Sequence, residues 1–336
     1  MLALRVERQN AEHMRKILLK DNLLDRSRRI IQKRDFVELP VFSGEIQTMN
    51  TDFTLVEQTN PLLRCPTFNF EEVKRTLGAH LNIDVRAFRG GWEKIGDILI
   101  IELPEGLEEE KYKIGKKLLE LFPKSKTVVN RKAIEGTFRE PEIEVIAGSG
   151  TETIHRENYC LFKIDVADVM FSAGNVSERQ RMATISNNTE TVLDMFSGIG
   201  QFTIPVAKHS RPRKVYAIER NPAAFSFLKE NVRLNRLSNV EPIPGDCREA
   251  SVPACNRIIM GYFFNPEKFL PYAIDSLASE GTIHFHDLVM KKEIPKRKEE
   301  IKKEIKRLGR DAEIEHRIVK SYAPMRWHAI FDLRVK

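Results

Sequence analysis

Residues 192–203 read Val-Leu-Asp-Met-Phe-Ser-Gly-Ile-Gly-Gln-Phe-Thr, and this stretch decides the fold of the C-terminal part of the chain. An apolar run ends at the carboxylate Asp194, and a turn that contains Gly198 and Gly200 follows it. Glycines in such a turn allow the backbone to approach a ligand closely. The pattern predicts a strand, a ligand-binding turn and a helix in an open α/β sheet.

The spacing within this turn indicates which ligand it holds. A nicotinamide-binding turn reads Gly-x-Gly-x-x-Gly and holds a pyrophosphate, whereas this turn reads Asp-x-x-x-Gly-x-Gly. That form fits S-adenosylmethionine, which carries no phosphate. Two further acids follow expected strands, with Glu219 placed to accept the ribose hydroxyls and Asp246 placed to meet the adenine amino group. The alternative is that these carboxylates only cap helices.

Strand and helix patterns alternate from residue 169 to residue 336, which is typical of a doubly wound parallel sheet. The expected parallel strands are 191–195, 214–219, 240–243, 257–261 and 282–286. Residues 327–335 fit an antiparallel terminal strand. Residues 291–310 fit an amphipathic helix, with an RNA contact as the alternative.

Two smaller α/β segments precede this domain. Residues 1–64 are expected to form a small domain that ends in a linker, because residues 43–66 are rich in Gly, Asn and Pro. Residues 65–168 predict a middle α/β domain, with a strand at 95–103, a helix at 108–122 and a last strand at 160–166. The predicted fold class is therefore α/β, with a Rossmann-like C-terminal domain and two smaller domains before it.

Composition limits the classes of function. Lys and Arg number 55 against 48 Asp and Glu, and the net charge of +7 favours a polyanionic partner without identifying one. Apolar runs stay below the roughly 18 residues that cross a bilayer, and the start lacks the features of a secretion signal, so we expect a cytoplasmic protein without a membrane partner. Cys65, Cys160, Cys247 and Cys255 form no Cys-x-x-Cys pair, which predicts reduced thiols and no metal site.

Residues 170–183 form an unusual mixture just before the cofactor-binding strand. We expect this segment to fold over the ligand, with Phe171 against adenine and with Ser172 and Arg179 as polar contacts. Glu178 is expected to face the reacting base. The alternative is a solvent-exposed helix whose charges pair with each other.

Two later motifs have a structural interpretation. Asn265-Pro266 superficially resembles the Asn-Pro-Pro-aromatic signature of amino-group methyltransferases, but Asn as an N-cap with Pro at the first helical position is the better interpretation. His284 and His286 alternate on one face of a strand, and without a third ligand they predict buried, hydrogen-bonded histidines.

The chain resembles the archaeal transferases that act on position 37 of tRNA, next to the anticodon. The resemblance runs from Gly96-Asp97-Ile98 through Glu135-Gly136 and Thr153-Ile154-His155 to Tyr322-Ala323-Pro324. One relative is the tRNA guanine N1-methyltransferase. The other is the wyosine-pathway aminocarboxypropyltransferase, which moves the methionine-derived chain of S-adenosylmethionine onto 4-demethylwyosine.

The end of the fourth strand separates the two relatives. The methyltransferase typically carries Asn-Leu-Pro where this sequence has Gly261-Tyr262-Phe263. Further motifs that look like the aminocarboxypropyltransferase are Arg139-Glu140-Pro141, Phe171-Ser172, Asn175-Val176, Glu178-Arg179, Ile283-His284-Phe285-His286 and Trp327-His328. The N-terminal segment, from Leu4 to Val41, is instead similar to the first domain of the methyltransferases.

This resemblance implies transfer of the 3-amino-3-carboxypropyl group to position 37 of tRNA(Phe), with N1-methylation of guanine as the alternative and a non-catalytic RNA-binding protein as a third possibility. It also implies that residues 1–64 and 65–168 grip the tRNA through Arg and Lys. The predicted catalytic residues are Glu178 and Tyr262. The predicted cofactor-binding residues are Phe171, Ser172, Arg179, Asp194, Phe196, Gly198, Glu219, Arg220, Asp246, Cys247 and Gly261.

Overall fold

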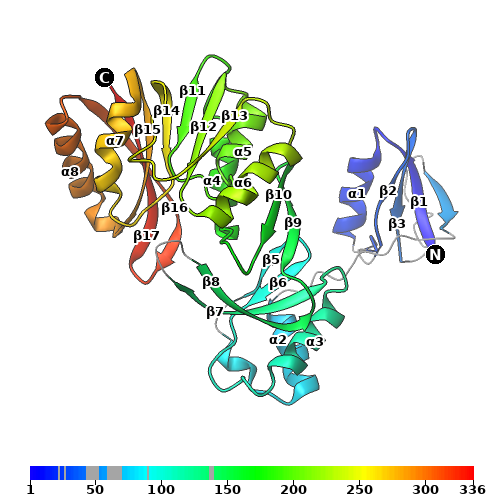
Figure 1. Cartoon of the computed structure of the whole chain (residues 1–336). Helices are drawn as coiled ribbons and strands as arrows, with labels where there is room; N and C mark the ends of the chain where they lie inside the picture. Colours follow the sequence, from blue (N-terminus) through cyan, green and yellow to red (C-terminus); the bar gives the residue numbers. More distant parts are fainter. Residues whose placement is uncertain (22, 26–27, 43–52, 59–69, 89–90, 136–139) are drawn as a thin grey trace. The chain divides into compact units, whose positions relative to one another are not determined.

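The computed structural model describes the chain except for residues 22, 26–27, 43–52, 59–69, 89–90 and 136–139 (Figure 1). Cys65, Gly136 and Arg139 therefore lie outside the described residues. The chain divides into two units, Met1–Ala79 with Glu120–Pro123, and His80–Leu119 with Lys124–Lys336. Over the described residues, no helix combines the length and the apolar character that spanning a membrane requires.

The N-terminal unit contains a four-stranded antiparallel sheet in the order β2-β3-β1-β4. Its elements are β1 (Leu2–Glu7), α1 (Ala11–Lys20), β2 (Ile31–Gln32), β3 (Phe36–Pro40) and β4 (Thr54–Glu57), and α2 (Phe70–Leu81) follows. Met14 and Leu18 of α1 are buried in one cluster with Leu4 of β1. Strand β4 lies in the segment that we expected to be a linker, and it forms because its apolar Leu55 pairs opposite Leu4.

A second sheet, in the order β5-β6-β7-β8, begins the larger unit. Its elements are β5 (Glu93–Ile95), β6 (Ile98–Ile101), α3 (Lys111–Leu121), β7 (Thr127–Glu135) and β8 (Glu140–Gly148), and a 3₁₀ turn (Val85–Ala87) precedes them. The sequence predicted one strand over residues 95–103, but Gly96, at φ +57°, turns the chain so that Ile95 pairs with Ile98. A left-handed backbone conformation of this kind favours glycine.

Strands β9 (Glu152–Glu157) and β10 (Cys160–Asp165) form a separate antiparallel hairpin. The predicted strand over residues 160–166 is confirmed as β10, but it pairs with β9 and not with the sheet of the middle segment. Two asparagines of α6 (Pro222–Leu234) and its C-cap hold the hairpin instead. Asn231 and Asn235 accept from the backbone N–H groups of Lys163 and Leu161 at 2.6 and 3.0 Å. Asn231 also donates to the carbonyl of Ile199, at 2.9 Å, and so joins the hairpin to the glycine turn.

The C-terminal sheet has seven strands in the order β13-β12-β11-β14-β15-β17-β16. They are β11 (Thr191–Asp194), β12 (Lys214–Glu219), β13 (Val240–Pro244), β14 (Cys255–Met260), β15 (Leu277–Val289), β16 (Ala312–Ala323) and β17 (Arg326–Val335). The first five are parallel, and β17 runs antiparallel to both of its neighbours, β15 and β16, which confirms the predicted parallel sheet and terminal strand. The sequence did not predict β16, an edge strand with many polar, exposed side chains.

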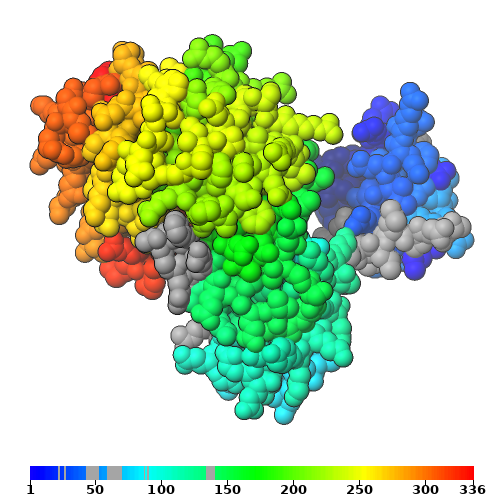
Figure 2. All heavy atoms as spheres, in the orientation of Figure 1, coloured from blue at the N-terminus to red at the C-terminus, as the bar shows by residue number. Residues whose placement is uncertain are grey.

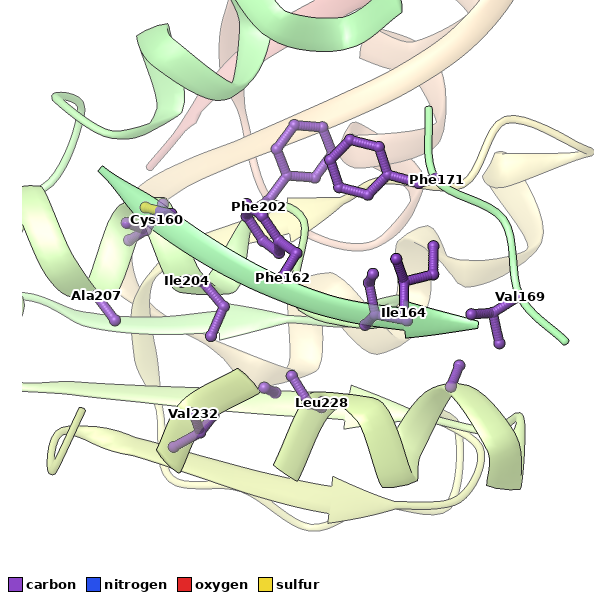
Figure 3. Packing of buried hydrophobic residues seen from close by; sticks show 14 of the residues in the cluster. Cys160, Phe162, Ile164, Val169, Phe171, Phe202, Ile204, Ala207, Leu228 and Val232 are labelled. Carbon is purple, nitrogen blue, oxygen red and sulfur yellow. The ribbon is translucent and has the colours of Figure 1, made fainter. Parts of the chain in front are cut away.

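Helices cover both faces of this sheet. They are α4 (Val176–Met182), α5 (Thr203–Pro205) with the π turn Val206–Ser210, α6, α7 (Leu270–Ser276) and α8 (Ile294–Arg307), with 3₁₀ turns at Ala173–Asn175, Pro266–Phe269 and Lys291–Glu293. Neighbouring residues of β11 point to opposite faces: Val192 packs with Phe162 and Leu228 in the cluster of Figure 3, and Leu193 packs with the cluster under α7 and α8. Helix α8, orange in Figure 2, lies at the surface of this unit and buries Ile294, Ile301 and Ile305, which confirms the predicted amphipathic helix.

Candidate active site

A cavity of about 570 Å³ lies where β11, β12, β13 and β14 end. Open α/β sheets bind their ligands at this carboxyl edge, and roughly 300–1,000 Å³ is usual for a ligand pocket. Ten of the predicted site residues line it: Phe171, Ser172, Phe196, Gly198, Glu219, Arg220, Asp246, Cys247, Gly261 and Tyr262. The sequence thus predicted about a third of the residues in this wall.

Asp194 has a different place from the one predicted. It is fully buried, and among the described residues it is not part of the cavity wall. Its carboxylate accepts from Thr203 Oγ1 at 2.7 Å and from the backbone N–H of Phe196 at 3.3 Å. Burial raises the pKa of Asp194 to about 6. Asp194 therefore fixes the shape of the turn from beneath and makes no contact with the space above it.

Gly198 and Glu219 form the part of the wall that fits an adenosine. Gly198 has φ +54°, and a Cβ built there would meet nothing within 4 Å, so the backbone is open to a ligand. Its N–H donates to Glu219 Oε2 at 2.7 Å, and the N–H of Asn221 donates to Oε1 at 2.7 Å. Each carboxylate oxygen keeps a second lone pair for a ribose hydroxyl. Burial raises the pKa of Glu219.

The turn after β13 supplies a carboxylate and a thiol. Arg248 donates to both oxygens of Asp246, at 2.9 and 2.7 Å, and this pairing lowers the pKa of Asp246 to about 2. Arg220 lies 3.6 Å from the same carboxylate. Burial raises the pKa of the neighbouring Cys247 thiol to about 12, so Cys247 contributes a neutral, weakly polar surface.

Aromatic rings form the opposite side of the cavity. Tyr262 stacks on Phe196 with ring centroids 5.1 Å apart, and Phe269 meets Phe196 edge-on at 4.9 Å. At Gly261, an added Cβ would lie 3.3 Å from the ring of Phe202. A side chain at position 261 would therefore displace the ring beside it, and this wall suits glycine.

The segment before α4 reaches the cavity through Phe171 and Ser172. Arg179, only 1% exposed, lies behind them and does not belong to the described cavity wall. Its guanidinium donates to both oxygens of Glu157 at 2.6 Å and to the carbonyl of Ser172 at 2.6 Å, and it covers the ring of Phe171 at 4.6 Å. Burial opposes ionisation of Glu157, but the hydrogen bonds from Arg179 and His155 lower its pKa to about 2. We predicted a direct contact of Arg179 with the ligand. In the structure Arg179 instead holds Phe171 and Ser172, two residues of the cavity wall, in place.

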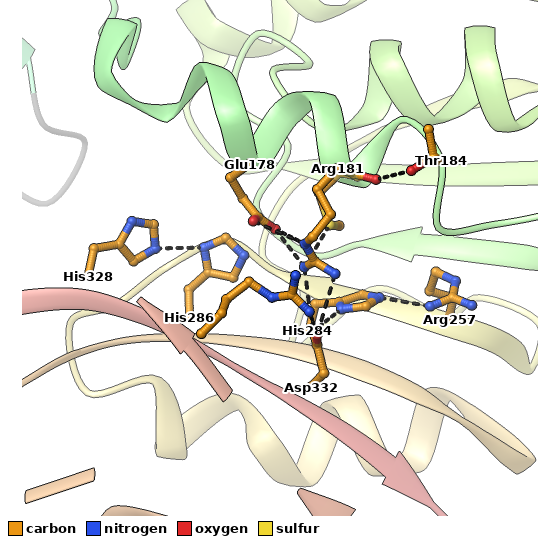
Figure 4. Close-up of polar contacts among 10 residues, drawn as sticks. Glu178, Arg181, Thr184, Arg257, His284, His286, His328 and Asp332 are labelled. Atoms are coloured by element: carbon orange, nitrogen blue, oxygen red, sulfur yellow. Dashed lines mark hydrogen bonds and ion pairs between the residues drawn. The ribbon is translucent and has the colours of Figure 1, made fainter. Parts of the chain in front are cut away.

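Glu178 likewise does not belong to the described wall of the cavity, and its carboxylate points toward Arg181 (Figure 4). It is 3% exposed and accepts a bidentate pair from Arg181, with the closest contact at 2.6 Å. Burial raises its pKa. This placement does not fit the predicted role of a base that faces the substrate, because the carboxylate of Glu178 is already paired with Arg181 of the same helix.

Two buried histidines, His284 and His286, lie near Arg181, and His328 lies next to His286 (Figure 4). His284 Nδ1 lies 2.5 Å from Asp332, and its Nε2 lies 2.8 Å from the guanidinium of Arg257. A guanidinium can only donate, so Nε2 accepts, the ring is neutral, and Nδ1 donates to Asp332. His286 and His328 share one hydrogen bond of 3.0 Å. The prediction of buried, hydrogen-bonded histidines is confirmed. Across the described residues, no group of three or more His, Cys, Asp or Glu is arranged to hold a metal ion.

The stability that the buried, neutral histidines contribute to this domain should fall as the pH drops from 6.5 toward 4. Burial lowers the pKa of His284 and of His328 to about 4, from 6.5. A lowered pKa in the folded state means that the stabilisation is complete above pH 6.5 and is lost as the pH falls through about 4. Each imidazole gives a slope of roughly 1.4 kcal/mol per pH unit. His286, whose pKa burial also lowers, acts in the same direction, whereas the raised pKa of Asp194 acts in the opposite one. Urea unfolding at pH 7 and at pH 5 measures the loss, which should be smaller in His328→Gln by roughly 2 kcal/mol, the share of one imidazole. An unchanged slope in the variant would contradict this assignment.

The interpretation of Asn265 as an N-cap is correct in position but not in its contacts. Asn265 precedes Pro266, which starts a 3₁₀ turn. Its backbone is left-handed, with φ +51°, and its side chain makes no capping hydrogen bond. Asn tolerates this conformation better than most residues, so it permits a sharp turn after β14.

Sequence reasoning missed several residues of the wall. Gln201, which follows the glycine turn, accepts from the N–H of Ser172 at 3.1 Å and donates to the carbonyl of Met170 at 3.2 Å. Lys320, on the unpredicted strand β16, donates to Ser172 Oγ at 3.2 Å. The position of Gln201 beside the glycines was an available signal. Nothing local in the sequence signals Lys320, because it reaches the cavity only through the pairing of β16 with β17.

Family models match three consecutive parts of the chain. They are the tRNA methyltransferase 5 N-terminal domain at residues 3–45, the TYW2 N-terminal domain at residues 73–151 and the TRM5/TYW2 methyltransferase domain at residues 153–316. The chain is 43% identical, over 247 residues, to the tRNA(Phe) (4-demethylwyosine(37)-C(7)) aminocarboxypropyltransferase of Methanocaldococcus jannaschii, a match that covers 72% of this chain and 97% of that protein. The chain belongs to the TRM5/TYW2 family.

Relatives in the TRM5/TYW2 family match either the whole chain or about three quarters of it. It is 33% identical, over 344 residues, to the tRNA (guanine(37)-N(1))-methyltransferase Trm5b of Pyrococcus abyssi, and the match covers 99% of each chain. The crystal structure of M. jannaschii TYW2 in complex with AdoMet aligns with a TM-score of 0.60 and 39% identity, over 73% of this chain and 99% of that one. These relatives confirm the predicted resemblance and the predicted α/β fold class with its Rossmann-like domain.

Proposed function

We propose that this chain transfers the 3-amino-3-carboxypropyl group of S-adenosylmethionine onto 4-demethylwyosine at position 37 of tRNA(Phe). The observation that carries the proposal is the wall at Gly261-Tyr262, where glycine stands against Phe202 and an aromatic ring follows it. The higher identity to the aminocarboxypropyltransferase than to Trm5b supports the same choice.

Methylation of guanine N1 is the second candidate function. The match of residues 3–45 to the tRNA methyltransferase 5 N-terminal domain favours it, as does the match of Trm5b to 99% of the chain. A non-catalytic RNA-binding role is disfavoured because the cavity keeps Glu219, Asp246 and the open backbone at Gly198.

The residues of the cavity fit S-adenosylmethionine. Glu219 would hold the ribose, Asp246 would meet the adenine amino group, and Phe171 and Phe196 supply apolar surface. The carboxylates also favour a cationic sulfonium over a phosphate-bearing nucleotide.

S-adenosylmethionine supplies electrophilic carbons beside its sulfonium, and displacement at the methionine side-chain carbon leaves methylthioadenosine, whereas displacement at the methyl leaves S-adenosylhomocysteine. The chain must therefore select one carbon by placing the acceptor base within about 3–3.5 Å of it. Tyr262, held by Phe196, would orient the base by stacking. Glu178 takes a positioning role in this proposal, because it holds Arg181 of the same helix, and Arg181 reaches Asp332 of β17 at 3.4 Å.

Product analysis tests the proposal. The full chain is incubated with S-adenosylmethionine and with tRNA(Phe) that carries either 4-demethylwyosine or unmodified guanosine at position 37. Methylthioadenosine formed only with the modified tRNA is the expected result. S-adenosylhomocysteine formed with unmodified tRNA would establish the methyltransferase instead.

The proposal includes the division of labour along the chain and the location of the protein. Residues 1–64 and 65–168 would grip the anticodon region of the tRNA, and residues 169–336 would carry out the reaction. The family matches at residues 3–45 and 73–151 lie within the first two segments, and the match at residues 153–316 begins before residue 169. Because the substrate is tRNA, the predicted cytoplasmic location belongs to the same proposal.

Gly198→Ala should weaken binding of S-adenosylmethionine by at least about tenfold, because the new methyl group would enter the space that the backbone leaves for the ligand. Gly309→Ala is a matched control: Gly309 also has positive φ, at +80°, and nothing within 4 Å of the added Cβ. Both variants should lose roughly 1–2 kcal/mol of stability from the left-handed backbone. Titration calorimetry separates them, and equal affinities in the two variants would show that the ligand does not approach Gly198.

A further inference from the structure

A second cavity, of about 540 Å³, adjoins the active-site cavity. It is formed by the loop after β14, the end of β15, the start of α8 and the turn between β16 and β17. Phe263, Phe264 and Tyr322 line both cavities. An aromatic wall therefore separates two spaces of similar size, and the two spaces are next to each other.

The rings of this wall are partly open to solvent. Phe263 lies 5.0 Å from Phe264 and 5.2 Å from Tyr322, measured between ring centroids. Phe264 is 41% exposed and Tyr322 is 40% exposed. Apolar rings held in one cluster but left half open are the usual platform on which unpaired nucleobases stack.

Four carboxylates and three cations among the described residues line the second cavity, and this balance disfavours a phosphate in its interior. Arg297 is already paired with Asp287 at 2.6 Å and with Glu267 at 2.8 Å. Glu293 and Glu300 also line the space. Carboxylates repel a phosphate, but they accept hydrogen bonds from the amino and imino groups on the edge of a base.

Cations lie at the border of the cavity, where a nucleic-acid backbone would pass. Lys296, whose side chain is 80% exposed, and Arg326 belong to its lining. Lys291 lies over the ring of Trp327 at 3.8 Å, just before α8. Exposed Lys and Arg beside a base-sized pocket provide the phosphate contacts of single-stranded RNA.

We propose that the second cavity holds the base of an unpaired nucleotide next to the acceptor nucleotide in the RNA strand. This inference rests on the proposed function, since it takes the active-site cavity to receive the acceptor base. The two bases would lie on opposite sides of the aromatic wall, with Glu293 or Glu300 meeting the edge of the second base. Such a site splays neighbouring nucleotides apart and selects single-stranded loops.

The test is a double-mutant cycle between protein and RNA, measured as dissociation constants of the full chain for tRNA. One tRNA is intact, and two others lack the base on the 5′ or the 3′ side of position 37. Loss of one of these bases should weaken binding to the unaltered chain about 5- to 100-fold, the range for one base–aromatic stack. In Phe264→Ala the same loss should change binding less than about twofold, because the stack is already absent.

Glu300→Gln is a conservative change at a residue that lines the second cavity and not the first. In this variant, removal of the base should weaken tRNA binding less than in the unaltered chain but more than in Phe264→Ala. Met325→Ala, at a neighbouring residue that is 70% exposed, is the control and should keep the full coupling. If base removal weakens all four proteins by the same factor, or weakens none, the proposal is wrong. Calorimetry with S-adenosylmethionine distinguishes the two failures: a chain that binds neither this compound nor tRNA overturns the proposed function, whereas a chain that binds both without coupling overturns only the second site.

Discussion

Glu219→Ala is expected to weaken binding of S-adenosylmethionine by at least about 100-fold. In the proposed complex, Glu219 accepts hydrogen bonds from the ribose hydroxyls while its oxygens also hold the N–H groups of Gly198 and Asn221. Hydrogen bonds to a charged group contribute roughly 1.5–3 kcal/mol each, and two of them correspond to a factor of about 100 or more. The variant also leaves two backbone donors without their acceptor, so the turn should lose part of its order.

Titration calorimetry with the full chain measures this effect. Glu219→Gln keeps the size of the side chain and an acceptor oxygen, and it should bind more tightly than the alanine variant. Glu241→Ala removes a half-exposed carboxylate that pairs with Lys214 on the neighbouring strand, and its affinity should stay unchanged. An unchanged affinity in Glu219→Ala would place the ribose elsewhere.

Arg179→Ala should lower the free energy of unfolding by about 3–5 kcal/mol. The change leaves the partly buried carboxylate of Glu157 with His155 but without its bidentate partner, and it removes the donor to the carbonyl of Ser172. Removing one member of a buried ion pair carries a cost of this size. Because Phe171 and Ser172 then lose their support, affinity for S-adenosylmethionine should fall as well.

Urea unfolding of the full chain tests this prediction, and Arg156→Ala is a matched control. Arg156 lies on the same hairpin as Glu157 but is exposed, so its removal should change stability by less than about 0.5 kcal/mol. A double variant, Glu157→Gln with Arg179→Met, removes both charges and should recover part of the loss. A loss below about 1 kcal/mol in Arg179→Ala would contradict the prediction. It would mean that the attraction between Arg179 and Glu157 only balances the cost of removing both charges from water.

The sequence predicted the parallel sheet well because its information is local. A strand buried on both faces must be apolar along its length, and the side chain that ends it must lie at the ligand edge, so residues such as Glu219 and Asp246 could be placed from spacing alone. Strand β16 escaped prediction for the opposite reason. As an edge strand it needs few apolar residues, and only its pairing with β17 defines it.

The directions of Glu178 and Arg179 could not be predicted, because they depend on partners far away in the sequence. Both side chains belong to the seven-residue helix α4, and a helix this short has no periodic pattern to show which side is buried. Glu157, 22 residues earlier, draws Arg179 inward. Asp332, 151 residues after Arg181, accepts from this partner of Glu178 at 3.4 Å. Charged residues in this segment suggested ligand contacts, and the fold used them for internal pairs.

Asn231 ties three segments together, since one amide meets both main-chain groups of Lys163 and the carbonyl of Ile199. The consequence is mechanical. The turn that would hold the adenosyl group is bonded to the hairpin through Asn231. A shift of the turn would therefore require the hairpin to move as well or these hydrogen bonds to break. Asn231 therefore holds the glycine turn in one conformation, although Asn231 itself does not belong to the described cavity wall.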